Sequence, residues 1–258
     1  MRSRSAFRRH LALVVYKTYA DLRSESERTY VGFLWWIAEP VISMLVYYLV
    51  FGVLLDRGIP NYVQFLFVGL IPWRWLQTTV VHGASSILGA RSLMQQVYVS
   101  KLVFPVVAVL TDTFKFLVVF VLLLLFLWAT GFGVAWSYLA LPLVAVAQLA
   151  LICGLTVIFA GIAPLFPDVR IVLDNLVRLW FFLSGVFYDV DRFSETASGY
   201  LRLNPMTTIL ESYRAILLDG EWPDPARLLV ILVGSLGLCL AGTAWVRRYE
   251  FIYPKLRF

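Results

Sequence analysis

The residues that could do chemistry in this chain are ionisable side chains inside long apolar runs. Glu39 lies about two turns into one run, Asp112 and Lys115 lie three residues apart in another, and Asp174 and Arg178 lie four apart in a third. A charged group in lipid is costly, so each of them should face protein or water. The spacings place the members of each pair on one helix face, where they can neutralise each other. The pairs favour a structural contact or a polar channel wall over a proton relay.

Motifs for catalysis or cofactor binding do not stand out. The sequence holds no Gly-x-x-x-x-Gly-Lys-Ser/Thr motif that would bind ATP phosphates. Neither His10 nor His82 has a partner at ligand spacing, so no metal site is predicted. Asp189-Val190-Asp191 matches the metal-binding Asp-x-Asp pair of many sugar-nucleotide transferases, but the motif is short and we interpret it as a solvated turn. The chain is predicted to be a conduit without catalytic residues or a bound cofactor.

Two helix faces combine aromatic and polar side chains, one in the apolar run around Glu39 and one around Arg178. Such faces suit sugar rings, whose C–H faces stack on aromatic rings while their hydroxyls need donors and acceptors. A packed helix interface would show the same pattern. The predicted channel-lining residues are Trp36, Glu39, Ser43, Tyr47, Arg178, Phe181 and Tyr188.

Composition places the chain in a membrane. Of its 258 residues, 60% are hydrophobic and only 15% are charged, with a mean hydropathy of +0.80, whereas soluble domains are about half apolar and a quarter charged. The net charge of +6 does not indicate nucleic acid, because the cations flank the apolar runs. Cys153 and Cys239 lie inside such runs and are interpreted as small hydrophobic residues.

The pattern predicts an all-α integral membrane protein with one transmembrane domain, residues 1–258. It comprises a cytoplasmic interfacial helix (1–32), five spans (33–188), an extracytoplasmic polar segment (189–226), and a sixth span with a cytoplasmic tail (227–258). The distribution of cations predicts that both termini are cytoplasmic. A break or kink is expected near Pro72 and Arg74, and the arginine should snorkel or be paired. Gly32 should supply the turn from the N-terminal helix into the first span. A capping box at Thr208–Glu211 should open a short helix that closes at Asp219-Gly220. The expected spans are Phe33–Leu55, Tyr62–Leu88, a third from Val103, a fourth ending at Pro164, Ile171–Tyr188 and Leu228–Val246.

Short motifs occur in a characteristic order, and together they cover nearly the whole chain. This order resembles the permease subunits of ABC-2-type polysaccharide exporters, which carry O-antigen, capsule or teichoic acid chains. Two positions depart from the family pattern: Glu25-Ser26 stands where Arg-Tyr is common, and Pro167 replaces an Arg whose role therefore cannot be transferred. The matching motifs are Asp21-Leu22-Arg23, Val31-Gly32, Leu34-Trp35, Pro40, Lys101–Pro105, Phe166–Val169, Asn204–Thr207 and Tyr213-Arg214.

The resemblance implies a homodimer in the bacterial inner membrane, associated with two separate ATPase subunits that hold ATP and Mg. The cargo would be a lipid-linked polysaccharide. The N-terminal helix would form a cytosolic gate, and the short re-entrant helices of Asp189–Ala226 would form an extracytoplasmic lid. Gly89–Lys101 would be the coupling helix that docks on the ATPase. Coupling residues would be Arg91, Gln95, Gln96 and Lys101, and lid residues Asn204, Pro205, Glu211 and Arg214. Two alternatives remain: an ABC-2 permease for a small hydrophobic cargo such as a drug or lipid, and a membrane enzyme or scaffold acting on lipid-linked sugars.

Overall fold

A computed structural model describes residues 2–27, 32–47, 49–50, 61–96 and 99–253. Within these residues the regular structure is helical throughout, as the composition predicts. The expected end of the first span near Leu55 and most of the following turn lie outside the described residues.

Three helices in the described part of the chain are long and apolar enough to cross a membrane, judged by length and composition alone. Each has at least 25 residues, and about 20 suffice to cross the hydrocarbon core. They coincide with the third, fourth and sixth predicted spans. Their bounds are α5 (Val103–Ala129), the continuous pair η3 (Trp136–Ala140) and α6 (Leu141–Ile162), and α10 (Pro225–Tyr249).

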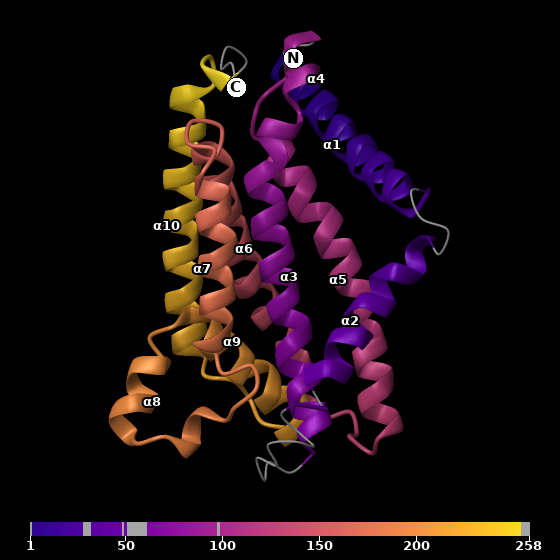
Figure 1. The fold of residues 1–258 in the computed structure, drawn as a ribbon, viewed down its shortest axis with the longest axis vertical. Helices are drawn as coiled ribbons and strands as arrows, with labels where there is room; N and C mark the ends of the chain where they lie inside the picture. The colour runs from indigo at the N-terminus through magenta and orange to yellow at the C-terminus, as the bar shows by residue number, and fades with distance from the viewer. Residues whose placement is uncertain (1, 28–31, 48, 51–60, 97–98, 254–258) are drawn as a thin grey trace.

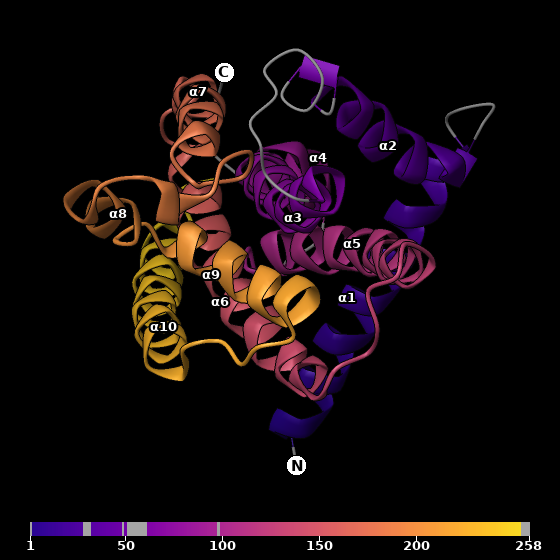
Figure 2. The ribbon, with the colours of Figure 1, turned by 90° about the horizontal axis from the view of Figure 1, so that it is seen from below.

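Helix α3 (Tyr62–Gly89) is the centre of the bundle, with α5, α6 and α7 (Val169–Phe182) around it (Figure 2). Of the predicted break or kink near Pro72, the break is wrong, since α3 is one continuous helix of 28 residues. A proline inside a helix removes one backbone hydrogen bond, and such helices persist when neighbours satisfy the exposed groups. Separately, the side chain of Gln148 on α6 donates to the Pro72 carbonyl at 2.7 Å and ties α3 to α6 at this level.

The N-terminal region forms an arm that stands beside the bundle and contacts α5 and α3 (Figure 1). Helix α1 (Arg2–Glu27) precedes a short 3-10 turn, η1 (Gly32–Leu34), and then α2 (Trp35–Tyr47). Gly32 has a φ of +61°, a conformation that glycine adopts without strain. A helix before Gly32 and a turn at Gly32 are thus present as predicted, and they bring the side chains of α2 toward α3.

The remaining short elements gather at opposite ends of the molecule (Figure 1). Helix α4 (Arg91–Gln96) lies at the same end as the start of α1 and the end of α10. At the other end lie the short helices that connect α7 to α10. Their bounds are η4 (Val190–Arg192), α8 (Glu195–Leu201), α9 (Pro205–Arg214) and the π-helical turn η5 (Ala215–Asp219).

Helix α7 ends earlier than predicted, at Phe182 rather than at Tyr188. Gly185 follows in a turn with φ of +67°. The expectation that Tyr188 continues a helical face from Arg178 is therefore wrong. The apolar residues up to Tyr188 continue past the helix as a loop, because side chains from α9 bind the carbonyls of that loop.

The opening of α9 also differs from prediction. The capping box at Thr208–Glu211 is wrong, because α9 begins three residues earlier, at Pro205. The Asn204 side chain accepts a hydrogen bond from the Met206 N–H at 3.0 Å and forms the N-cap. Pro205 occupies the first helical position, which tolerates its missing N–H. The predicted close at Asp219-Gly220 is confirmed, with Gly220 at φ of +74°.

Candidate functional site

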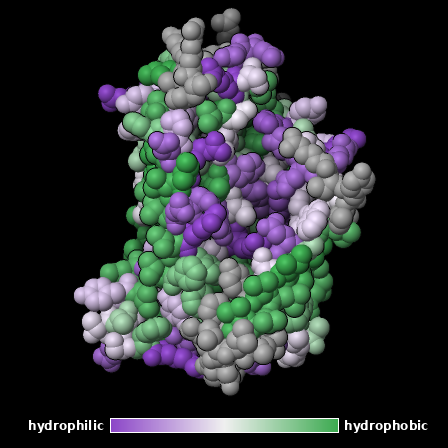
Figure 3. Space-filling model, viewed as in Figure 1, coloured by the Kyte–Doolittle hydropathy of each residue, from purple (hydrophilic) through white to green (hydrophobic). Residues whose placement is uncertain are grey.

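A polar cavity of about 210 Å³ lies between the N-terminal arm and the bundle. Figure 3 shows a hydrophilic area in the middle of this face of the molecule, bordered by hydrophobic surface. An apolar bundle that keeps charged groups at mid-height has to pair them or expose them to water. The cavity is lined mainly by Glu25 of α1, Trp36 and Glu39 of α2, Arg74, Trp75 and Thr78 of α3, and Asp112, Lys115 and Phe116 of α5.

Lys115 is the centre of a charge network in this cavity. Its Nζ lies 2.7 Å from Glu25 Oε1 of α1 and 3.3 Å from Asp112 Oδ1 on its own helix. The predicted Asp112–Lys115 pair is thus confirmed, and a second carboxylate joins it from 90 residues away. The ammonium also lies 5.7 Å from the centre of the Trp36 ring, within the range of a cation–π contact.

His82 extends the network toward a neighbouring cavity. Its Nδ1 lies 2.9 Å from Asp112 Oδ2, so the buried Asp112 carboxylate contacts a cation on one oxygen and an imidazole on the other. Together with Lys17 and Asp21 of α1, His82 also lines another cavity, of about 310 Å³. Sequence spacing missed this role, because the partner of His82 lies 30 residues away on another helix. The available signal was an imidazole within an otherwise apolar helix.

Glu39 of α2 pairs with Arg74 of α3, with Oε1 and Nη2 3.2 Å apart. This ion pair confirms the predicted pairing of Arg74, and it gives Glu39, which is predicted to face protein or water, a protein partner. The Glu39 side chain keeps 67% of its surface exposed, so the pair lies at the open edge of the cavity. Ser43 is half-buried on the same helix, and the side chain of Tyr47 lies outside the described part.

The predicted channel residues of α7 do not join this cavity. Arg178 is exposed and pairs with Asp174 at 2.6 Å, which confirms their predicted mutual neutralisation. Phe181 is buried instead, because it continues the core stripe of Leu173 and Val177 at a spacing of four residues. Tyr188 lies in the loop after α7 and donates to the Phe182 carbonyl at 3.1 Å.

Arg214, a predicted lid residue, holds this loop in place. Its guanidinium is buried and donates to the carbonyls of Gly185 at 2.8 Å and Val186 at 2.7 Å. It also lies over the Phe65 ring, 3.5 Å from the centre, and next to Gly69 of α3. One side chain therefore ties α9 to α3 and to the turn after α7.

Asn204 reinforces the same junction. Its amide nitrogen donates to the Leu183 carbonyl at 3.1 Å, and its oxygen accepts from the Trp180 indole at 2.8 Å. Glu211 on α9 binds the Arg202 guanidinium at 3.1 Å, and Asp191 contacts the other side of that guanidinium. Burial raises the pKa of Glu211 while Arg202 opposes the shift. The short helices thus form a linked unit at this end of the bundle.

The predicted coupling segment has exposed residues in its helix and a buried residue at its end. The helix expected within Gly89–Lys101 is present as α4. Arg91 is half-buried there, and Gln95 and Gln96 are exposed. Lys101 is buried, with its Nζ donating to the Val99 carbonyl at 3.0 Å. The exposed side of α4 is therefore accessible to a partner, whereas the Lys101 side chain is held against the backbone at Val99.

Comparisons with known proteins agree with this architecture. A family model described as ABC-2 type transporter matches residues 20–218. The chain is 34% identical over 243 residues to the O-antigen export system permease protein RfbA of Myxococcus xanthus, a match that covers 93% of this chain and 94% of that protein. It is 25% identical over 252 residues to the polysialic acid transport protein KpsM of Escherichia coli, covering 96% and 97%. The inner membrane transport permease YadH of Escherichia coli K12 is 28% identical over 195 residues, covering 69% and 73%.

The matched region begins at the end of α1 and continues through the short helices, so it includes both the polar cavity and the junction around Arg214. The apolar helices and the permease relatives together make the chain an integral membrane protein of the inner membrane. With a family model matched over most of its length, this chain belongs to the ABC-2 type transporter family.

Proposed function

We propose that this chain is the membrane subunit of an ATP-driven exporter that moves lipid-linked polysaccharide across the bacterial inner membrane. The observation that carries the proposal is the similarity to the Myxococcus xanthus O-antigen permease over nearly the whole of both chains. A family match alone would leave the cargo open. The relative named for polysialic acid transport also matches almost end to end, which favours a polysaccharide over a small molecule.

The polar cavity suits a polyhydroxylated chain. The partly buried Trp36 offers an aromatic ring, while Glu39, Arg74 and Lys115 offer acceptors and donors. Stacking and hydrogen bonds of this kind hold each sugar weakly, which a chain in transit requires. In this proposal the cavity forms one wall of the conduit.

A second copy of the chain would complete the conduit. The mouth of the polar cavity cannot face lipid without a large cost, because it carries the partly exposed Glu39–Arg74 pair. Two copies that face each other across this surface would enclose it and keep apolar helices such as α10 toward lipid. The proposed assembly is therefore a homodimer around a polar axis.

Energy would come from two separate ATPase subunits, since the sequence lacks a phosphate-binding loop. ATP and Mg would bind to those subunits. Helix α4 is the proposed docking element, because Gln95 and Gln96 are exposed at the end of the molecule where α1 begins and α10 ends. The cations near both termini favour a cytoplasmic location for this end, which places α8 and α9 on the outer side.

Deletion of the gene in its host distinguishes this proposal from the alternatives. Polysaccharide export predicts that the polymer is made but retained inside the cell, and that the intact gene restores it to the surface. Unchanged surface polysaccharide together with altered drug sensitivity would instead indicate a small hydrophobic cargo. Loss of synthesis, with no polymer inside or outside, would indicate a membrane enzyme or scaffold. Fractionated cells analysed by gel with polysaccharide staining give the readout.

A further inference from the structure

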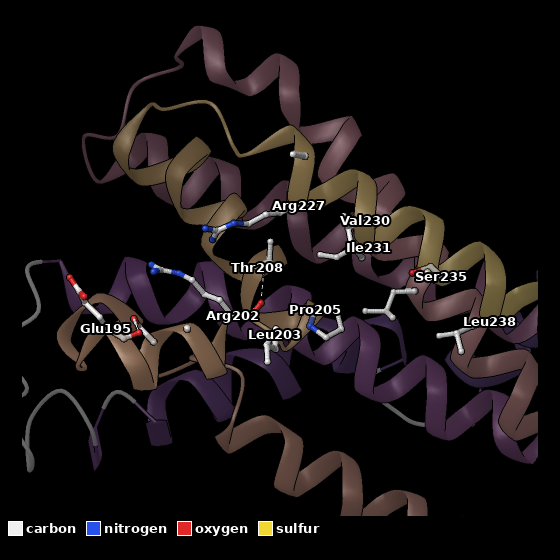
Figure 4. A pocket seen from close by; sticks show the side chains of 15 residues that line it. Glu195, Arg202, Leu203, Pro205, Thr208, Arg227, Val230, Ile231, Ser235 and Leu238 are labelled. Atoms are coloured by element: carbon white, nitrogen blue, oxygen red, sulfur yellow. Dashed lines mark hydrogen bonds between the residues drawn. The ribbon is translucent and has the colours of Figure 1, made fainter.

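A second cavity, of about 990 Å³, lies between α6, α10 and the α8–α9 segment. It shares no lining residue with the polar cavity described above. Figure 4 shows Glu195, Arg202 and Arg227 toward one end of it, and Ser235 and Leu238 of α10 toward the other. This groove, as we call it, therefore has a charged end and an apolar end.

The apolar end follows a helix that faces lipid. Helix α10 is long and apolar enough to cross a membrane, and its exposed side chains near the groove include Leu229, Val230 and Val233. From Arg227 to Leu238 the helix rises eleven residues, which corresponds to about 16 Å. Leu151 of α6 and Ile231 of α10 also line this stretch. The shape and polarity match a hydrocarbon chain that lies along α10.

The charged end carries both signs, with carboxylates in excess. Arg202 contacts Asp191 and Glu211, and Arg227 Nε lies 3.1 Å from Asp224 Oδ2. Among the charged residues, Glu195, Arg202 and Arg227 line the groove, while Asp191, Glu211 and Asp224 lie behind the two arginines as their ion-pair partners. Four carboxyl groups therefore stand against two guanidinium groups at this end. A ligand with net negative charge is repelled by this excess. An ammonium group is attracted to it, and the two arginines still present N–H donors that a phosphate can accept.

We propose that the groove binds a phospholipid whose headgroup carries both a phosphate and a primary ammonium, as phosphatidylethanolamine does. The headgroup lies at Glu195, Arg202 and Arg227, and one acyl chain lies along α10. A quaternary ammonium fits less well because it has no N–H to donate to a carboxylate. Bound lipid would fill the space between α8 and α10 and hold α8 in place. The proposal concerns a structural lipid and does not depend on which cargo crosses the conduit.

Two glycines of α10 provide a matched test. A Cβ at Gly234 or at Gly237 would meet no heavy atom within 4 Å, so both positions tolerate a larger side chain. Gly234 lines the groove and Gly237 does not. Gly234→Phe should therefore fill the groove, whereas Gly237→Phe adds the same side chain to the same helix outside it.

The experiment is native mass spectrometry of the purified protein, delipidated in detergent and supplied with equal amounts of phosphatidylethanolamine, phosphatidylglycerol and phosphatidylcholine. The unmodified chain and Gly237→Phe should retain phosphatidylethanolamine about tenfold more than either other lipid, equivalent to about 1.4 kcal/mol. Gly234→Phe should lose this retention, and Glu195→Gln should reduce the preference over phosphatidylcholine.

Three outcomes would overturn the proposal. Equal retention of the three lipids by the unmodified chain would mean non-specific surrounding lipid only. Preference for phosphatidylglycerol would contradict the argument from excess carboxylates. Identical spectra for Gly234→Phe and Gly237→Phe would place the lipid elsewhere. Each of these results leaves the export proposal untouched, because export is measured by where polysaccharide accumulates.

Discussion

The ammonium of Lys115 lies 2.7 Å from the carboxylate of Glu25, and this contact ties the last turns of α1 to the middle of α5. Lys115 also faces the buried Asp112 at 3.3 Å. The N-terminal arm is therefore attached to the bundle at Lys115, the cation that balances the charge of the buried Asp112 carboxylate. Any movement of the arm away from α5 separates Glu25 from this cation.

Lys115→Met should destabilise the protein far more than Glu25→Gln. Loss of the cation leaves the Asp112 carboxylate buried beside His82 alone, with an expected cost on the order of 3 kcal/mol. Glu25 is half exposed, so its loss should cost less than about 1 kcal/mol. Thermal unfolding of the purified variants in detergent measures both. Arg23→Gln, which breaks an exposed pair with Glu27 on the same helix, is the control and should change nothing measurable. Equal losses for the two test variants would show that Lys115 does not compensate Asp112.

The Glu39–Arg74 pair should respond to charge exchange. Glu39→Arg places two cations side by side at the mouth of the cavity and should reduce export severalfold, and Arg74→Glu does the same with two carboxylates. The double exchange should restore most of the export, because the pair is re-formed in reverse. Surface polysaccharide per unit of membrane-inserted protein is the readout. The same exchange at Asp174 and Arg178, an exposed pair outside the cavity, should leave export unchanged throughout. If the double exchange did not restore export, the role of these residues would depend on which side chain stands at each position and not on the ion pair.

The packing around Arg214 should not tolerate one added methyl group at Gly69. A Cβ at Gly69 would lie 2.5 Å from Arg214 Nη2 and 3.0 Å from the Val186 carbonyl, so Gly69→Ala must displace the guanidinium from its two carbonyls. The expected loss is about 1–3 kcal/mol, with a lower midpoint of thermal unfolding. Gly237→Ala adds the same methyl group in open space on α10 and should be neutral or slightly stabilising. A neutral Gly69→Ala would mean that the Arg214 junction is looser than its hydrogen bonds indicate.

The surface of α4 should control coupling to the ATPase, and Lys101 should not. Replacing exposed Gln95 and Gln96 with Glu, together with Arg91→Glu, should abolish export while leaving the protein in the membrane. ATPase stimulation by the reconstituted permease should fall in parallel. Lys101→Met affects a buried side chain and should lower thermal stability first, with export lost only in proportion to folded protein. Normal export by the triple variant would exclude α4 from the docking surface.

Local spacing in the sequence was enough to predict several features of this protein. Membrane insertion follows from composition, and the reversals at Gly32 and Gly220 follow from residues that adopt positive φ without strain. The Asp112–Lys115 and Asp174–Arg178 pairs were predictable because three or four residues bring two side chains to one face of any helix. The glycine turns and the two ion pairs depend only on residues within about one turn of the chain.

Contacts between distant segments were decided only by the tertiary structure. Helix α7 ends at Phe182 because Asn204 and Arg214, about twenty to thirty residues later, bind the carbonyls that follow it. The Pro72 carbonyl of α3 takes its side-chain partner, Gln148, from α6, 76 residues later. Glu25 and His82 join the cavity because helix packing brings them to Lys115 and Asp112. The physical reason is the same in each case: a polar group in an apolar bundle takes whichever partner the packing of the helices provides, and sequence spacing does not encode that choice.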